Sequence, residues 1–240
     1  MVTDMELAAL AVRLTDEASA EPLDAGRILA ALVEGVRRLV GTLGAGVHYA
    51  VPGDGEVRTE GTSTELRALT ADAAAWGEGP AHEVRTAGRP LIDVDVTGRP
   101  ARVRWPRWVP RARALGLARV TALPLSDGGA TVGALVLHGG PGPSLGMPAL
   151  MRARAVGGMA ADMLSLVREV ERNRSLVAQL DHALTSRVVI EQAKGMLSVR
   201  RGVSVDEAFT LLRGYARSHR RKITEIAADI TEGRADLHAL

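Results

Sequence analysis

The chain of 240 residues contains no cysteine. Disulfide bonds, thiolate metal sites, iron–sulfur clusters and cysteine nucleophiles are therefore excluded, together with redox sensing through thiols. Aromatic residues make up only 2% of the sequence, and lysine occurs only at Lys194 and Lys222, so arginine supplies most of the positive charge. The formal net charge is only +2. Such a balance does not suit a general nucleic-acid coat, and any nucleic-acid contact must come from a local basic patch.

Long apolar runs are missing as well, because no stretch approaches the roughly 18 residues that a membrane span needs. The first residues, MVTDMELAAL, place acids before any basic residue, which argues against a signal peptide. The content of hydrophobic residues, 46%, is that of a folded protein. We therefore expect a soluble cytoplasmic protein with no membrane contact, built as two modest domains or one large one.

The N-terminal part alternates between helical and strand patterns. Apolar spacing predicts helices over residues 23–41 and 64–76, a strand over 91–94, and a helix ending near Gly116. Two apolar runs joined by Asp127, Gly128 and Gly129 predict a β-hairpin, and AGVHYAV before EVRTEGTS predicts strand, turn and strand. Strands and helices in this order indicate an α+β fold, with helices packed against an antiparallel sheet.

A stretch with few helix breakers follows, from about Met147 to Val199, and predicts one long helix or two nearly continuous ones. Part of it has apolar residues at spacings of four, seven, three and four, with Asn173 in the gap. These residues are Leu166, Val170, Val177, Leu180 and Leu184. Two interpretations remain open: a helix packed entirely on its own domain, or an exposed helix that forms a dimer.

The C-terminal stretch resolves into three helical segments, which predict a small three-helix bundle. The first covers about residues 185–200, and the second opens with a capping box formed by Ser204 and Glu207. The third begins near Arg221 or Lys222 and ends at Gly233. The apolar register also places Phe209 and Tyr215 in the bundle core, although stacking of either residue on a base stays an alternative.

Basic residues crowd the expected start of this third helix, where the macrodipole and the free N–H groups favour an anion instead. Ten basic residues against eight acidic ones in residues 181–240 show that the signal is an asymmetry and not an excess. A solvated surface explains the pattern, and so does a phosphate site. Residues expected on one cationic face are Lys194, Arg200, Arg201, Arg213, Arg217, Arg220, Arg221 and Lys222, with Arg187 on the same stripe as Lys194.

Gly195 lies inside a predicted helix, where glycine costs roughly 1 kcal/mol relative to alanine. Close approach of the backbone by a partner, or by another helix of the same chain, accounts for a glycine at such a position.

The motifs IEQAKGML, GVSVDEAF, LLRGYA and RKITEIAADI, over about residues 181–233, together resemble the ANTAR domain of bacterial antitermination regulators. The resemblance implies a three-helix bundle that binds paired RNA hairpins in a nascent leader mRNA and so prevents a terminator from forming. It also implies a homodimer. By this likeness the RNA-binding residues are Ala193, Lys194 and Gly195, followed by Arg220, Arg221 and Lys222, and the other arginines of the cationic face extend the surface.

The preceding part resembles a GAF domain, a small-molecule sensory fold, in GEGPAHEVRTAGRPLIDVD and ALGLARVTALPLSDGGATVGALVLHG. This likeness implies a GAF domain over residues 23–165, a connecting helix over 166–184 and an ANTAR domain over 185–240. The implied signal is an unidentified small molecule or protein. Candidate pocket residues are Trp76, His82, Trp105 and Trp108, although the tryptophans also suit simple packing. No cofactor or metal is expected; haem would need an axial ligand such as His48, His82 or His138.

The sequence also bears on three other classes of function. An enzyme, such as a signalling phosphodiesterase or a cyclase, is disfavoured because no P-loop, nucleophile elbow or clustered metal-ligand motif occurs. A DNA-binding helix-turn-helix is disfavoured because Glu225, Asp229 and Glu232 would repel the groove. A protein-interaction module without nucleic acid remains open. No receiver-like pattern of strands ending in paired acids is found, so a ligand or a protein is the expected signal.

Overall fold

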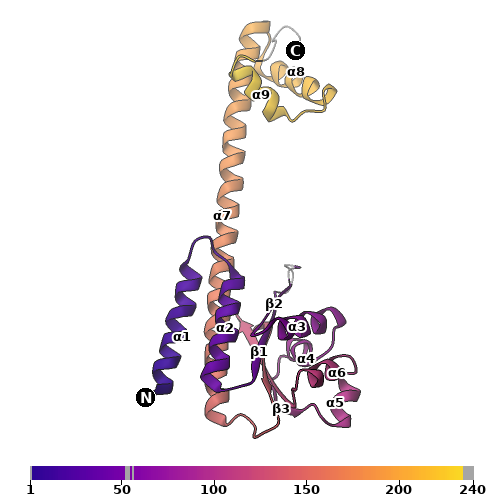
Figure 1. The fold of residues 1–240 in the computed structure, drawn as a ribbon. Helices are drawn as coiled ribbons and strands as arrows, with labels where there is room; N and C mark the ends of the chain where they lie inside the picture. Colours follow the sequence, from indigo (N-terminus) through magenta and orange to yellow (C-terminus); the bar gives the residue numbers. More distant parts are fainter. Residues whose placement is uncertain (1, 52–54, 56, 235–240) are drawn as a thin grey trace. The chain divides into compact units, whose positions relative to one another are not determined.

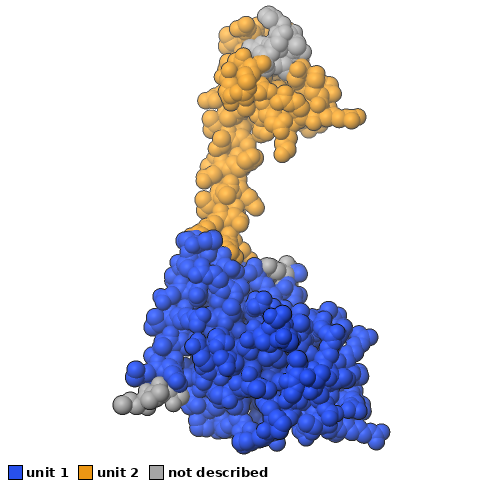
Figure 2. All heavy atoms as spheres, viewed as in Figure 1, with its two compact units in different colours: residues 1–170 blue, residues 171–240 orange. Residues whose placement is uncertain are grey.

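The computed structural model describes residues 2–51, 55 and 57–234. The chain divides into two compact units, residues 1–170 and residues 171–240, coloured blue and orange in Figure 2. Among the described residues, no helix is both long enough and apolar enough to cross a membrane.

Unit 1 is built around an antiparallel sheet of five strands in the order β2-β1-β5-β4-β3 (Figure 1). The strands are β1 (Gly44–Ala50), β2 (Val57–Gly61), β3 (Leu91–Asp95), β4 (Arg119–Asp127) and β5 (Ala130–Gly139). The helices of this unit are α1 (Val2–Ser19), α2 (Ala25–Val40), α3 (Thr64–Trp76), α4 (Pro80–Ala87), α5 (Arg99–Arg104), α6 (Trp108–Ala114) and the first part of α7 (Met147–Arg201). The predicted α+β class, with helices against an antiparallel sheet, is confirmed.

Helices cover both faces of this sheet and form two separate apolar cores. On one face α2 and α7 pack on the sheet and α1 packs against α2, with Leu14, Leu32 and Leu164 fully buried among them. On the other face α3, α4, α5 and α6 enclose a second core that contains Trp105, Trp108 and Val136. Because side chains alternate across a strand, one sheet supplies both cores.

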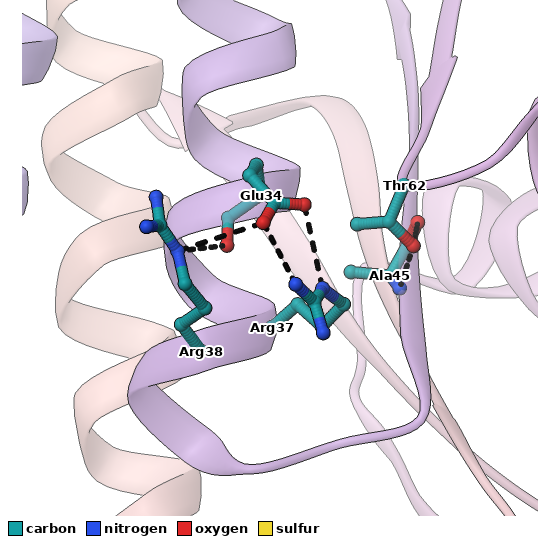
Figure 3. A network of polar contacts seen from close by, with 5 residues as sticks. All are labelled: Glu34, Arg37, Arg38, Ala45 and Thr62. Atoms are coloured by element: carbon teal, nitrogen blue, oxygen red, sulfur yellow. Dashed lines mark hydrogen bonds and ion pairs between the residues drawn. The ribbon is translucent and has the colours of Figure 1, made fainter.

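Local signals in the sequence explain where these elements begin and turn. Gly128 and Gly129 have φ of 55° and 88°, as a two-residue turn between twisted strands requires, and the predicted hairpin of β4 and β5 is confirmed. Figure 3 shows two groups of polar contacts in this unit. Glu34 accepts hydrogen bonds from Arg37 and Arg38 along α2, and the Thr62 hydroxyl exchanges hydrogen bonds with the backbone of Ala45 next to β2.

Two features of unit 1 differ from the sequence-based expectation. Residues 2–19, which carry no assigned domain, form α1, and the buried side chains of Leu10 and Leu14 attach this helix to the first core. The helix expected to end near Gly116 is α6, and a second short helix, α5, which was not expected, precedes it and ends at Trp105. A loop breaks the pattern there because Pro106 follows Trp105 directly and disfavours a helical conformation at that tryptophan.

Helix α7 is one continuous helix of 55 residues, so the version with a single long helix is confirmed. Its first part is buried in unit 1 through Ala153, Val156, Ala160 and Leu164. From Glu171 to Thr185 every residue is exposed in this chain. The exposed apolar side chains of α7 include Leu166, Leu176, Val177, Leu180, Leu184 and Val188, each more than half exposed.

Unit 2 ends in a bundle made of the last part of α7, α8 (Val205–Ser218) and α9 (Ile223–Thr231), which we call the C-terminal bundle (Figure 1). The predicted capping box is confirmed, since the Ser204 hydroxyl accepts from the Glu207 N–H and the Glu207 carboxylate accepts from the Ser204 N–H. The buried core consists of Ala193, Leu197, Ala208, Leu212, Ala216, Ile226, Ala227 and Ile230. Alanines fill half of this set, so the three backbones approach closely around a thin core.

Candidate nucleic-acid interface

Lys194, expected to be an anion ligand, is held by the bundle itself. Its ammonium Nζ donates to both carboxylate oxygens of Glu191 at 2.9 Å, and it lies 5.2 Å from the centre of the Phe209 ring. Only 13% of the Lys194 side chain is exposed. A phosphate would therefore have to compete with Glu191 for this ammonium, and the lysine stem also covers the aromatic ring.

The basic residues before the third helix do not crowd its first turn, because the helix starts after them and because local ion pairs neutralise part of their charge. Helix α9 begins at Ile223, so the preceding basic residues lie in the connecting turn, and the first turn of the helix contains Glu225. Arg221 donates to Asp229 at 2.7 Å and lies 3.6 Å from the Glu225 carboxylate. The Arg221 guanidinium, with help from Arg234, holds the pKa of the Asp229 carboxyl below its ordinary value. Arg221 is therefore neutralised within the bundle.

A second group of basic side chains in unit 2 is exposed and forms no ion pair with any other described residue. We call this group the unpaired cations. They are Arg187, Arg200, Arg201, Arg213, Arg217, Arg220 and Lys222. All except Arg213 are among the RNA-binding residues inferred from the sequence, and Arg213 was assigned to the same cationic face.

The turn between α8 and α9 gathers part of this group. The Arg221 N–H donates to the carbonyl oxygen of Ala216 and the Arg220 N–H to that of Arg217, which is the pattern of a Schellman motif. The residue in the left-handed position of that motif is usually glycine, whereas here it is Arg220, with φ of 52°. This conformation costs an arginine roughly 1 kcal/mol. The turn thus presents Arg217, Arg220 and Lys222 from one short segment.

Five of the seven unpaired cations lie at the two ends of α8, whereas the sequence predicted one cationic face. Arg200 and Arg201 end α7 beside the α7–α8 loop, whereas Arg217, Arg220 and Lys222 lie at the opposite end of α8. A helix of 14 residues spans about 20 Å. The physical reason is that α8 is too long for its two ends to share one small site. The surface therefore suits an extended polyanion better than a single phosphate.

Gly195 and Ala193 differ in their surroundings. Ala193 is fully buried in the bundle core, so its role in the described chain is packing. A Cβ added to Gly195 would meet no described heavy atom within 4 Å. Packing of another helix of this chain therefore does not account for the glycine, and the backbone there remains accessible to a partner.

The aromatic residues of the bundle are only partly in its core. Tyr215 is half-buried and packs against the core, as expected, whereas Phe209 is half-buried and lies outside that cluster. Sequence reasoning missed His219, whose ring stacks on Tyr215 with centroids 3.9 Å apart and an interplanar angle of 24°. Their spacing of four residues, with His219 at the C-terminal cap of α8, was the available signal.

In unit 1 the candidate pocket residues separate into packing residues and surface residues. Trp105 and Trp108 are each 2% exposed and meet edge to face with ring centroids 5.5 Å apart. Trp76 is half-buried under the Arg111 guanidinium, and His82 is half-buried on α4. The packing interpretation therefore holds for Trp105 and Trp108.

Two buried histidines lie on the same face of the sheet as those tryptophans. His48 and His138 are 3% and 2% exposed, and neither ring nitrogen of either residue has a hydrogen-bond partner in the described structure. Burial lowers the pKa of each to about 4, with the positive charges of Arg85 and His82 adding to the shift at His48. Both imidazoles are therefore neutral at physiological pH.

A cavity of about 240 Å³ lies at another place in unit 1, against β3, β4 and the loop after β5. Its lining includes Asp93, Arg119 and Thr121, and none of the four candidate pocket residues. Asp93 has φ of 54°, its carboxylate pairs with Arg119 at 2.6 Å, and its N–H donates to the Thr121 hydroxyl. Among the described residues, no group of three or more His, Asp or Glu side chains is arranged to hold a metal ion.

Comparison with solved structures shows the fold of the first unit. The GAF domain of a phosphoenolpyruvate-protein phosphotransferase from Acinetobacter aligns with a TM-score of 0.50 at 11% identity, covering 69% of this chain and 96% of that one. A methyl-accepting chemotaxis protein fragment, residues 122 to 287, aligns with a TM-score of 0.51 at 15% identity, covering 67% and 98% of the two chains. No curated protein sequence matches this chain.

Family models match both parts of the sequence. The model of the GAF domain matches residues 22–165, more than half of the chain, and the model of the ANTAR domain matches residues 178–230. The second match includes the end of α7, α8 and nearly all of α9, and with them all seven unpaired cations. The chain therefore belongs to the GAF domain family and joins that domain to a C-terminal ANTAR domain.

Proposed function

We propose that this protein is an RNA-binding antitermination regulator whose ANTAR domain binds paired hairpins in nascent leader mRNA in the cytoplasm, without catalysing a reaction. The proposal rests on the unpaired cations, because they place exposed guanidinium groups at both ends of α8. Arginine binds phosphate bidentately and also stacks on bases, so such a surface suits a folded RNA.

The open backbone at Gly195 supports the same proposal. No described atom occupies the space where its side chain would be, although the position is inside a helix where alanine would be more stable. A ribose or phosphate can approach this backbone more closely than it could approach any other residue type. By contrast, Arg221 and Lys194 are paired with acids of the bundle and contribute less free charge.

We propose that the protein acts as a homodimer through the exposed part of α7. The apolar residues Val177, Leu180 and Leu184 repeat at heptad spacing, and each is more than half exposed in the single chain. Pairing with a second copy would bury them, at about 1.5–3 kcal/mol for each fully buried side chain. Sedimentation analysis of Leu180→Glu tests this point; a dimer that survives the substitution would contradict it.

We propose that the GAF domain senses a small-molecule or protein signal. The unpartnered ring nitrogens of His48 and His138 are hydrogen-bonding groups that a ligand can satisfy within the second core. Helix α7 then provides a continuous element from the GAF domain to the ANTAR domain. In unit 1 its Arg168 and Ser165 both bond to Asp127 at the tip of the β4–β5 hairpin, so a change in the sheet can reach this helix.

The main test is binding of the full chain to a two-hairpin RNA and to a duplex DNA of the same sequence, followed by fluorescence anisotropy at several salt concentrations. We compare the wild type with a variant in which Arg217, Arg220 and Lys222 are alanine. A matched control removes three exposed arginines of unit 1, Arg99, Arg102 and Arg107, and so changes the net charge equally.

The proposal predicts RNA-selective binding that weakens steeply with salt. Loss of three phosphate contacts lowers the slope of log K against log salt by about 2 to 3, whereas the control variant keeps the wild-type slope. An equal loss of RNA affinity in both triple variants would show that the attraction is nonspecific. If the wild-type dimer bound no RNA, a protein-interaction module would be favoured instead.

A further inference from the structure

The C-terminal bundle carries a histidine stacked on a tyrosine at its surface. The rings of His219 and Tyr215 lie 3.9 Å apart between centroids and within 24° of parallel. Tyr215 is half-buried against the bundle core, whereas His219 is exposed. One face of the imidazole therefore rests on the tyrosine, and its exposure comes from the opposite face and the edges.

Polar contacts fix the imidazole in this position. Its Nδ1 lies 3.0 Å from the carbonyl oxygen of Tyr215 and 3.0 Å from the hydroxyl of Ser218. The backbone N–H of His219 also donates to the Tyr215 carbonyl oxygen, at the C-terminal cap of α8. An aromatic ring held in this way loses little conformational freedom when a ligand stacks on it.

The other aromatic side chains of the bundle offer less free surface. The Phe209 ring lies beneath the ammonium of Lys194, which is itself held by Glu191. Tyr215 packs against the apolar core and is covered by the imidazole. Among the described aromatic rings of the bundle, His219 thus presents the most accessible face.

Two of the unpaired cations are close neighbours of His219 in the sequence. Arg217 precedes His219 by two residues and Arg220 follows it, and both are exposed. Arg220 adopts a left-handed backbone, with φ of 52°, at the position where a Schellman motif usually has glycine. Strain of this kind, retained where glycine would remove it, is a sign of a functional side chain.

We propose that one unpaired base of an RNA hairpin loop stacks on the exposed face of His219, while Arg217 and Arg220 bind the phosphates on either side of that nucleotide. This inference rests on the proposed RNA-binding function and adds the nucleotide element that the α8–α9 turn recognises. Loop bases are splayed out and accessible to aromatic side chains, whereas bases in a stem are not. Stacking of one base on one aromatic side chain changes affinity by about 5- to 100-fold.

The test uses the full chain and a labelled two-hairpin RNA in which each loop nucleotide is replaced in turn by an abasic one. For the wild type, one abasic position is expected to weaken binding by about 5- to 100-fold. His219→Ala is expected to weaken binding of the intact RNA by the same factor, and to show no further loss with that abasic RNA. His219→Phe keeps a ring for stacking and is expected to retain most of the affinity. His182→Ala, at another exposed histidine of the same unit, is the matched control and should match the wild type.

The outcomes separate this inference from the proposed function. If the wild type binds RNA but His219→Ala binds it equally well, the stacking proposal is overturned and the RNA-binding function stands. Additive losses for the abasic RNA and His219→Ala would equally overturn it, because the two changes would then act at different places. If the wild type binds no RNA, both proposals fail together. Thermal melting of each variant shows whether an affinity change accompanies loss of the fold.

Discussion

The described residues include two histidine–aromatic stacks, one in each unit, and they differ in what surrounds them. In unit 1 His138 stacks on Trp108 at 25° with centroids 6.2 Å apart, and both residues are 2% exposed. In unit 2 His219 stacks on Tyr215 at nearly the same angle, 24°, but is exposed and hydrogen-bonded. A histidine stacked on an aromatic ring therefore serves packing in the interior and leaves a face free at the surface.

The difference shows that burial determines the role of a side chain. Desolvation holds His138 neutral and leaves its nitrogens without partners, so protonation there opposes folding. At His219 solvent remains available, so a ligand can replace water on the ring without further rearrangement. The predictions below exploit this contrast.

The largest expected effect is on stability in unit 1. Trp108→Ala removes a fully buried side chain that contacts Trp105 and His138, and should lower the unfolding free energy by about 3–5 kcal/mol. His219→Ala removes an exposed ring and should cost less than about 1 kcal/mol. All three tryptophans lie in unit 1, so tryptophan fluorescence during urea unfolding measures the loss in Trp108→Ala, and far-ultraviolet circular dichroism, which follows the helices of both units, measures the loss in His219→Ala. Similar losses in the two variants would abolish the contrast.

The second effect is the pH dependence of folding. The folded pKa of His138, about 4, lies below the unfolded value of about 6.5, so the unfolded state binds the proton first and stability is lost as pH falls. Between pH 7.5 and pH 5 this histidine should remove about 2 kcal/mol. His138→Phe keeps a ring beside Trp108 and should reduce the acid-induced loss by that amount. Urea unfolding at pH 7.5 and pH 5 measures this loss. If His138→Phe loses as much unfolding free energy between the two pH values as the wild type does, His138 is not held neutral.

Some of these features could be predicted from the sequence, because they depend on neighbours in the chain. The capping box at Ser204 and Glu207 is one example, and the β4–β5 hairpin at Gly128 and Gly129 is another. The scarcity of helix breakers predicted α7 as a single helix in one of two versions. In each case the signal is local residue chemistry or periodicity.

Other features depend on which side chains meet after folding, and the sequence could not reveal them. Arg221 precedes α9 and pairs with Asp229, eight residues later in that helix. A cation that the sequence placed on the cationic face is therefore neutralised. Lys194 contacts Phe209 on another helix, and the space around Gly195 is known only once the bundle is built. His48 gave no sign of being buried without a partner, since a strand histidine suits either surface or core.

A third effect separates stability from binding at the α8–α9 turn. Arg220→Gly should stabilise the full chain by up to about 1 kcal/mol, because glycine adopts a positive φ without strain. The same substitution should weaken RNA binding, since it removes an unpaired cation. Arg220→Ala is the control, as it removes the charge and keeps the strain. Thermal melting and anisotropy measure the two quantities, and a destabilised Arg220→Gly protein would contradict the assignment of strain.

The smallest expected effect compares two glycines of α7. A Cβ at Gly195 or at Gly158 meets no described atom within 4 Å, so alanine should stabilise the helix at either position by up to about 1 kcal/mol. Only Gly195→Ala is expected to weaken RNA binding, because Gly158 lies in unit 1. Equal RNA affinity for both variants would remove Gly195 from the interface.

The most direct measurement is photo-crosslinking of the full chain to a two-hairpin RNA that carries 4-thiouridine in one loop, with the modified peptides identified by mass spectrometry. We expect adducts in residues 213–222, at or beside the stacked rings of Tyr215 and His219, and their loss in His219→Ala. Adducts confined to residues 23–165, or an unchanged pattern in that variant, would contradict the claim that the ANTAR domain contacts RNA through this turn.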